Sequence, residues 1–338
     1  MKIGICNLSG FSNRWIEYCK RKEISYKILN PYKNSIINDL KDCDIILWHF
    51  SHGKYKDVLF AKQLLYSAIY MGKKVFPDFN TSWHFDDKIG QKYLLEAIDA
   101  PFIPTYIFYT KQEAMQWINI TTFPKVFKLR GGAGSSNVFL ISNRQKARKM
   151  VCKAFGKGFS QFNRIGYFKE RIRLVEEKKD SITGIFKGLG RLFIPTEYAS
   201  MHGREKGYVY FQDFIPDNRY DIRTIFTDNK VFAIKRMVRA NDFRASGSGN
   251  ILYDRKEFDE RCIKITFEIQ NKLNTQSLAL DFVFDANNNP LITELSYGYN
   301  YSIYDPCPGY WDVNLNWHEE KFIPQEWILE QMLKTAEK

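Results

Sequence analysis

Two acidic residues near the C-terminal end of the chain have the spacing of a shared binding site. Residues 277–297 read as two alternating strands joined by a turn. If Asp285 opposes Pro290 across that turn, Asp281 and Glu294 lie directly opposite each other, with their β-carbons about 5 Å apart. Like charges in such positions destabilise a hairpin unless a cation lies between them. The pair therefore predicts a cation site.

Mg²⁺ suits two opposed carboxylates, because it binds one or two of them together with the phosphate oxygens of a substrate. The alternative is that Asp281 and Glu294 are two acids on a solvated face. A one-residue change of register would separate them. The predicted metal site therefore depends on the register in which the two strands pair.

A glycine-rich run, GGAGSS at residues 131–136, follows Lys128. Glycines let backbone N–H groups approach phosphate oxygens closely, and a lysine at the base of the loop can neutralise their charge. The run is not a Walker P-loop, because no Gly-Lys-Ser/Thr follows and a strand-like run at 138–141 comes next instead of a helix. A simple hairpin turn is the alternative interpretation.

A second hairpin, at residues 220–236, combines an acid with several cations. Asp228 and Asn229 predict a two-residue turn, and the resulting register places Asp221 opposite Arg236. That pair could be purely structural. Further polar residues follow at once, before a stretch that reads Ala-Ser-Gly-Ser-Gly: Arg239, Asn241 and Arg244. Cations grouped beside small residues indicate a cradle for a phosphoryl group.

The composition is that of an ordinary globular protein of 338 residues with an excess of 12 positive charges. Such an excess favours an anionic partner, but charge alone does not choose among nucleotide, nucleic acid and acidic membrane. The six cysteines form no CxxC pair, which favours free thiols in a reducing compartment. No segment has the length of a signal-peptide core or a membrane span, so we expect a cytoplasmic protein.

Two domains must position these residues. Residues 1–86 alternate strand-like and helical runs, which predicts a small α/β domain. No glycine-rich fingerprint follows the first strand, so dinucleotide binding is not supported. Residues 87–338 mix hairpins with helices at 145–193 and 256–273, which predicts an α+β fold for the second domain.

Taken in order, these segments resemble the ATP-grasp superfamily and, within it, the RimK-like carboxylate–amine ligases. LDFVFDANNNPLITELS resembles the paired Asp and Glu metal strands of that family, and DIR…KR…NDFRASGSG resembles its DIR…R…DFRSN pattern. The resemblance spans about 87–299. It implies two α+β lobes that grip ATP, a lid lobe at about 120–206 and a C-terminal lobe at about 207–338.

The resemblance also implies roles for single residues. Lys88 and Lys128 would contact the phosphates of ATP, and Asp221 would face its ribose. Arg236 and Arg244 would be the catalytic groups around the transferred phosphate, beside Ser246.

The base and the metal would be held elsewhere. Asp213 and Phe214, in YFQDFIP, look like the hinge that binds adenine. Asp281, Glu294 and Ser296 look like the Mg²⁺ ligands, with Ser296 at the position where the family has Asn. The remaining phosphate contacts expected from the glycine-rich loop are Gly132, Gly134 and Ser135.

The implied reaction forms an amide bond. A substrate carboxylate attacks the γ-phosphate of Mg-ATP, and an amine then displaces phosphate from the acyl phosphate. The partners would be a small-molecule or glycan carboxylate and an amine, in surface polysaccharide or peptide modification. The alternative is a kinase of the same fold that phosphorylates a small molecule or sugar. No helix-turn-helix, zinc or RRM signature supports nucleic-acid binding, and the sequence does not indicate the oligomeric state.

A basic segment at residues 164–206 contains ten Lys or Arg and six acids. Apolar residues at helical spacing predict that part of it is an amphipathic helix, and Gly188 weakens that helix by about 1 kcal/mol relative to Ala. We expect it to cap the donor or acceptor site. The alternatives are a helix packed on the lobe beneath and peripheral contact of GIFKGLGRLF with an anionic membrane.

Overall fold

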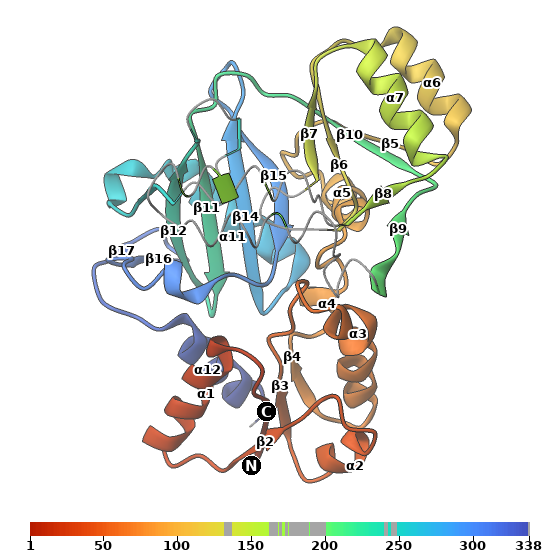
Figure 1. The fold of residues 1–338 in the computed structure, drawn as a ribbon. Helices are drawn as coiled ribbons and strands as arrows, with labels where there is room; N and C mark the ends of the chain where they lie inside the picture. Colours follow the sequence, from red (N-terminus) through yellow and green to blue (C-terminus); the bar gives the residue numbers. More distant parts are fainter. Residues whose placement is uncertain are drawn as a thin grey trace.

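The computed structural model describes residues 1–131, 137–161, 201–239, 243–244 and 249–336, and also the single positions 168, 171, 172, 175 and 189. The described residues form three lobes, each built on its own sheet (Figure 1). No described helix is both long enough and apolar enough to span a bilayer.

The N-terminal lobe is a parallel α/β unit whose four strands lie in the order β2-β1-β3-β4. Its strands are β1 (Ile3–Cys6), β2 (Tyr26–Leu29), β3 (Ile45–Leu47) and β4 (Lys74–Phe76). Its helices are α1 (Gly10–Arg21), α2 (Ile36–Leu40), α3 (Tyr55–Tyr70) and α4 (Phe79–Ser82). Strands β1 and β3 are buried along their whole length, as expected for a parallel sheet covered by helices.

Helix α5 (Lys88–Ala97) connects this lobe to the rest of the chain. Asp87 caps it, because its carboxylate accepts hydrogen bonds from the backbone N–H groups of Ile89 and Gly90. The cap fixes the first helical residue, Lys88, whose own backbone N–H donates to the carbonyl of Arg130 in the lid lobe.

The lid lobe is a four-stranded sheet in the order β5-β10-β6-β7, with two helices packed on one face (Figure 1). Its strands are β5 (Thr105–Phe108), β6 (Lys125–Lys128), β7 (Val138–Ile141) and β10 (Val209–Asp213). Its helices are α6 (Lys111–Ile120) and α7 (Arg144–Ala154), and a short pair, β8 (Phe159–Ser160) and β9 (Arg204–Glu205), lies beside them. Thr110 and Asn143 cap the two helices through their side-chain oxygens.

The C-terminal lobe is a larger antiparallel sheet in the order β15-β14-β11-β12-β16-β17, with β13 paired to β12. Its strands are β11 (Tyr220–Thr227), β12 (Lys230–Met237), β13 (Ile251–Leu252), β14 (Ser277–Phe284), β15 (Pro290–Ser296), β16 (Tyr310–Asp312) and β17 (Trp317–His318). Helix α11 (Glu260–Leu273) packs on one face, and two 3₁₀ turns cover Arg255–Glu257 and Tyr301–Ile303.

The last helix, α12 (Pro324–Ala336), packs on α1 and β4 of the N-terminal lobe (Figure 1). Trp327 and Ile328 belong to the same buried cluster as Trp15. The indole N–H of Trp15 donates to the carbonyl of Gln325 at 2.9 Å. The core of the N-terminal lobe therefore includes residues from both ends of the described chain.

The predicted fold class, an α/β lobe followed by α+β lobes, is confirmed. The division into domains at 1–86 and 87–338 stays a prediction. Most of the basic segment 164–206 lies outside the described residues, and its proposed role as a cap stays a prediction as well.

Candidate functional site

A cavity of about 980 Å³ lies between the lid sheet and the C-terminal sheet. Its lid wall consists of Val126 and Lys128 on β6 with Val138 and Leu140 on β7. The intervening Phe127 is buried with the helices on the other face of the sheet. Because side chains of a strand alternate between two faces, the same strands both line the cavity and carry the core of the lid.

The hairpin of β14 and β15 supplies the opposite wall. Asp281 is paired directly with Glu294, so the predicted positions of the two acids opposite each other in the hairpin are confirmed. Both residues line the cavity.

The register assumed at the turn was wrong by one residue. Phe284, and not Asp285, is opposite Pro290. A β-bulge then adds Thr293 to β15 between the pairs of Phe282 and Asp281, and this single extra residue restores the pairing closer to the site. The hydroxyl of Thr293 donates to the backbone carbonyl of Asp281 at 3.2 Å.

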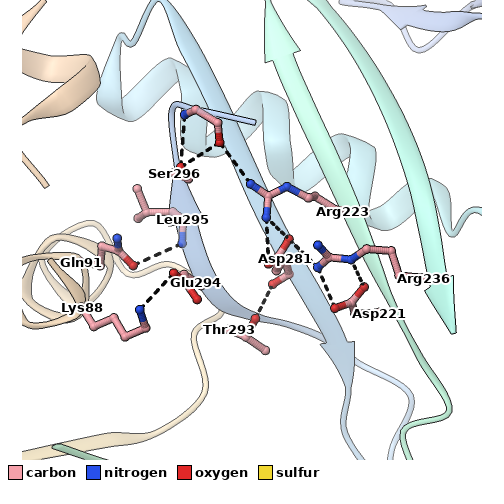
Figure 2. A network of polar contacts seen from close by, with 11 residues as sticks. Lys88, Gln91, Asp221, Arg223, Arg236, Asp281, Thr293, Glu294, Leu295 and Ser296 are labelled. Carbon is pink, nitrogen blue, oxygen red and sulfur yellow. Dashed lines mark hydrogen bonds and ion pairs between the residues drawn. The ribbon is translucent and has the colours of Figure 1, made fainter. Parts of the chain in front are cut away.

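Protein cations lie beside both carboxylates (Figure 2). Nη1 of Arg223 is 3.1 Å from each oxygen of Asp281, and Nη2 of Arg236 is 3.0 Å from Oδ1. Nζ of Lys88 is 3.2 Å from Oε1 of Glu294. Burial alone would raise the pKa of Asp281, but the two arginines outweigh it and hold that pKa below its ordinary value.

Arg236 joins two acids. The predicted register of β11 with β12 is confirmed, and Asp221 is opposite Arg236. Nε and Nη2 of Arg236 donate to the two oxygens of Asp221 at 2.6 and 2.7 Å, in a bidentate pair. Burial raises the pKa of Asp221 to about 6, so this carboxylate is ionised at neutral pH. Asp221 and Asp281, the two acids that Arg236 contacts, both line the cavity.

Two lysines complete the polar end of the cavity. Lys88 is 4% exposed and Lys128 is 8% exposed. Burial lowers the pKa of Lys128 to about 8, although Glu294 and Asp281 act to raise it. A buried ammonium group with a depressed pKa gains much from an added anion, because the anion replaces the hydration that burial removed.

The other end of the cavity is the segment predicted to be the hinge. Asp213 and Phe214 both line it. The carboxylate of Asp213 accepts a hydrogen bond from the buried Lys125 at 2.5 Å, and Lys125 also lies 5.3 Å from the centre of the Tyr106 ring. Phe214 therefore follows directly after Asp213, whose side chain is held by an ion pair to strand β6 of the lid sheet.

The described pair Phe243 and Arg244 also lines the cavity. The ring of Phe243 meets that of Phe214 edge to face, with centroids 5.8 Å apart. Ser296, the expected third metal ligand, donates its hydroxyl to the carbonyl of Gly298 at 3.0 Å and also lines the cavity. The remaining predicted contacts lie outside the described residues: Gly132, Gly134, Ser135 and Ser246.

The sequence interpretation missed Arg223 as a member of the site, and it missed Lys125 as the residue that holds the carboxylate of Asp213. Arg223 lies two residues after Asp221 and so on the same face of β11, which was a usable signal. Its contact with Asp281 arises from the pairing of β11 with β14. His52, from the loop after β3, also lines the cavity and brings the N-terminal lobe to its edge.

A Mg²⁺ ion fits the carboxylates only as part of a larger set of ligands. The described residues contain no cluster of three or more His, Cys, Asp or Glu with metal-binding geometry. Two carboxylates and a hydroxyl are hard oxygen donors of the kind that Mg²⁺ takes, with its other positions filled by water or phosphate. The donor set therefore suits a metal that arrives with a phosphorylated ligand.

No family model and no curated protein sequence matches this chain. Solved structures do resemble it. A RimK domain ATP-grasp protein from Sphaerobacter thermophilus superposes with a TM-score of 0.54 at 14% identity, over 90% of this chain and 93% of that one.

Two further structures match over nearly full length. D-alanine–D-alanine ligase from Bacillus anthracis has a TM-score of 0.56 at 15% identity and covers 100% of this chain and 99% of its own. D-cycloserine synthetase has a TM-score of 0.56 at 12% identity, over 99% of this chain and 98% of its own. At these identities the likeness concerns the fold, and it includes all three lobes. The chain therefore has the ATP-grasp fold.

Proposed function

We propose that this protein is an ATP-dependent, ADP-forming ligase that joins a carboxylate to an amine. The observation that carries the proposal is the polar end of the cavity, where opposed carboxylates meet buried cations. Such a site can neutralise a polyphosphate and hold its metal, which is most of what phosphoryl transfer requires. The opposite end offers a hinge backbone and aromatic rings to a planar base.

In this proposal, ATP would extend from one end of the cavity to the other. Lys88 and Lys128 would contact its phosphates, and Asp221 its ribose. The hinge at Asp213 and Phe214 would hold its base. A similar structure, D-alanine–D-alanine ligase from Bacillus anthracis, was solved as an ATP complex at 13% identity to this chain. That complex supports the proposal for the nucleotide.

The charges at the site favour Mg²⁺ that arrives with ATP. Three carboxylates face four cations in the network of the polar end: Asp221, Asp281 and Glu294 with Lys88, Lys128, Arg223 and Arg236. These seven side chains thus offer no net negative charge to a divalent cation, whereas the triphosphate supplies it. Bound between Asp281, Glu294 and Ser296, Mg²⁺ would supply charge neutralisation at the phosphates.

In the proposed reaction, a carboxylate oxygen of the substrate bonds to the γ-phosphorus, and the bond from that phosphorus to the bridging oxygen of ADP breaks. Arg236 and Arg244 would stabilise the charge on the transferred group. The amine nitrogen then bonds to the acyl carbon, inorganic phosphate leaves, and the nitrogen loses a proton to solvent. These residues act by positioning and charge, which is most of what phosphoryl transfer requires.

For the acid, we propose a small-molecule or glycan carboxylate, or a peptide end, and the net charge of +12 favours such anionic substrates. The setting would be cytoplasmic, in the modification of surface polysaccharide or peptide.

Hydroxylamine provides the test, because it traps an acyl phosphate as a hydroxamate whatever the natural amine is. We expect pools of carboxylic acids, incubated with Mg-ATP and hydroxylamine, to yield hydroxamate and ADP in equal amounts. Glu294→Gln should abolish both products, and Asp285→Asn, in the turn of the same hairpin, should retain them. A kinase would instead release ADP without forming hydroxamate, and equal activity of Glu294→Gln would exclude the proposed metal site.

A further inference from the structure

The positive charge of this protein is concentrated in one stretch of the chain. Residues 114–169 contain eleven Lys or Arg and not a single Asp or Glu. The rest of the chain then has 39 basic and 38 acidic residues, so its charges nearly cancel. Eleven of the 12 excess positive charges therefore lie in this segment, most of which folds into the lid lobe.

The described cations of this stretch divide between the two faces of the lid sheet. Lys128 faces the cavity. Six others lie on α7 and in the turn after it, on the face that carries the helices, and all six are exposed: Arg144, Lys146, Arg148, Lys149, Lys153 and Lys157. We call these six the α7 cationic face. Ala147, Val151 and Ala154 hold the helix against the sheet from its other side.

No described acid neutralises the α7 cationic face by an ion pair. Arg144 and Arg148 donate to the C-terminal end of α6, at Ile118 and Asn119, which leaves their charge in place. Lys153 lies over the ring of Phe159 at 4.5 Å. A surface with this many uncompensated charges of one sign attracts an anionic partner over a distance of about 10 Å at moderate salt.

The spacing of the lysines suits an extended partner. Lys146, Lys149 and Lys153 lie on one side of α7, because they are three and seven residues apart. At a rise of about 1.5 Å per residue, the two intervals are about 4.5 and 6 Å along the helix axis. A row of charges with these intervals complements a linear chain of anions, such as one carboxylate on each sugar ring, better than a single small anion.

We propose that the α7 cationic face is a docking surface for an acidic polysaccharide. The exposed positions of α7 carry no aromatic ring, which stacking on nucleic-acid bases requires. Beside them, Ile120 is an exposed apolar side chain at the end of α6, and one such side chain is too small an anchor for insertion into a bilayer. Charge without rings or apolar anchors is the pattern that a hydrophilic polyanion needs.

The position of this surface gives it a role beyond the proposed reaction. It lies on the helical face of the lid sheet, whereas the cavity lies on the other face. A polymer could therefore bind to the lid without blocking entry of the nucleotide. The docking surface would keep the enzyme bound to a polysaccharide that carries many carboxylates, while the cavity binds one carboxylate at a time. Binding at this face does not depend on which reaction occurs in the cleft.

The test uses the whole protein and a polyuronate oligosaccharide labelled with a fluorophore, with affinity measured by anisotropy at low and at physiological salt. We expect the triple variant Lys146→Glu, Lys149→Glu, Lys153→Glu to bind at least about tenfold more weakly than the wild type. A control variant with the same net charge changes three exposed lysines of the N-terminal lobe: Lys22→Glu, Lys33→Glu, Lys74→Glu. It should bind polyuronate within about twofold of the wild-type affinity. ATP affinity should be unchanged in both variants, which reports an intact fold. The corresponding Gln variants replace any Glu variant that does not fold.

Three results would overturn the proposal. The first is polyuronate affinity that is unchanged in the α7 variant, and the second is an equal loss in the control, which would show an effect of net charge alone. The third is tighter binding of the wild type to single-stranded RNA of equal charge, or to vesicles with anionic lipid, than to polyuronate.

Discussion

The buried lysine at the polar end of the cavity predicts that nucleotide binding is coupled to proton uptake. Burial lowers the pKa of Lys128 to about 8. At pH 8 about half of the nucleotide-free molecules then carry a neutral Lys128. Triphosphate beside the ammonium group favours its charged form and raises its pKa again. Binding at pH 8 should therefore take up about half a proton at this residue.

The same values give the pH dependence of affinity. Well below pH 8, Lys128 is already charged, and binding involves little proton uptake. Above pH 8, most nucleotide-free molecules carry a neutral Lys128, and this lysine must take up a proton when the nucleotide binds. If the bound state has the ordinary pKa of 10.5, the Kd for Mg-ATP should increase about tenfold between pH 7 and pH 9. Folding of the free protein shows the opposite trend, because the cost of the buried charge is present below pH 8 and disappears as pH rises towards 10.5.

Calorimetry in buffers of different ionisation enthalpy measures the proton uptake directly, and two substitutions identify its source. Lys128→Met removes the titrating group and should weaken binding at pH 7 by at least about tenfold, since a charge-assisted contact of about 1.5–3 kcal/mol is lost. Lys128→Arg keeps a charge that does not titrate in this range. Both variants should therefore lose the pH dependence, and the second should retain the better affinity.

The reasoning is refuted if wild-type binding at pH 8 takes up no proton. It is equally refuted if Lys128→Met takes up as much as the wild type, because the titrating group would then lie elsewhere. An unchanged Kd in Lys128→Met would show that this residue does not contact the nucleotide.

Two further predictions concern Arg223 and Phe243, which were not among the site residues predicted from the sequence. Arg223→Gln should lower the free energy of unfolding by about 3 kcal/mol, because it leaves the buried Asp281 with only part of its charge partners. Arg223→Lys should recover part of the loss. Denaturant titration measures both variants, and unfolding free energies equal to that of the wild type would contradict the ion-pair assignment. Phe243→Ala should weaken ATP binding by about threefold to tenfold through loss of the aromatic pair with Phe214. Affinity for inorganic triphosphate should stay the same, and a parallel loss for triphosphate would place Phe243 at the phosphates instead of the base.

Local pairing was predictable from the sequence, because alternation and turn residues specify it. The pairs Asp221–Arg236 and Asp281–Glu294 both follow from hairpins whose two strands are adjacent in the chain. In the second hairpin the assumed turn was wrong by one residue, and the bulge at Thr293 compensated. The alternation of polar and apolar residues determines which side chains share a face, and that constraint held although the turn differed.

Contacts between distant segments were not predictable in this way. Arg223 reaches Asp281 only because β11 also pairs with β14, and no local pattern indicates which strand lies beside β11. Lys125 and Asp213 are 88 residues apart and meet through the pairing of β6 with β10. Such pairings depend on the order of strands in a sheet, which arises from packing of the whole domain.

The position of α12 has a consequence for how the chain folds as it is synthesised. Trp15 and Gln325, joined by a hydrogen bond, are 310 residues apart, and α12 covers the apolar side of α1. The N-terminal lobe therefore lacks part of its core until both later lobes and α12 have been synthesised. During that interval α1 presents an uncovered apolar surface, which is the kind of surface that chaperones bind and that promotes aggregation. Contacts of such long sequence separation also slow folding. The N-terminal lobe should thus reach its final stability only after the two lobes that follow it in the sequence have been made.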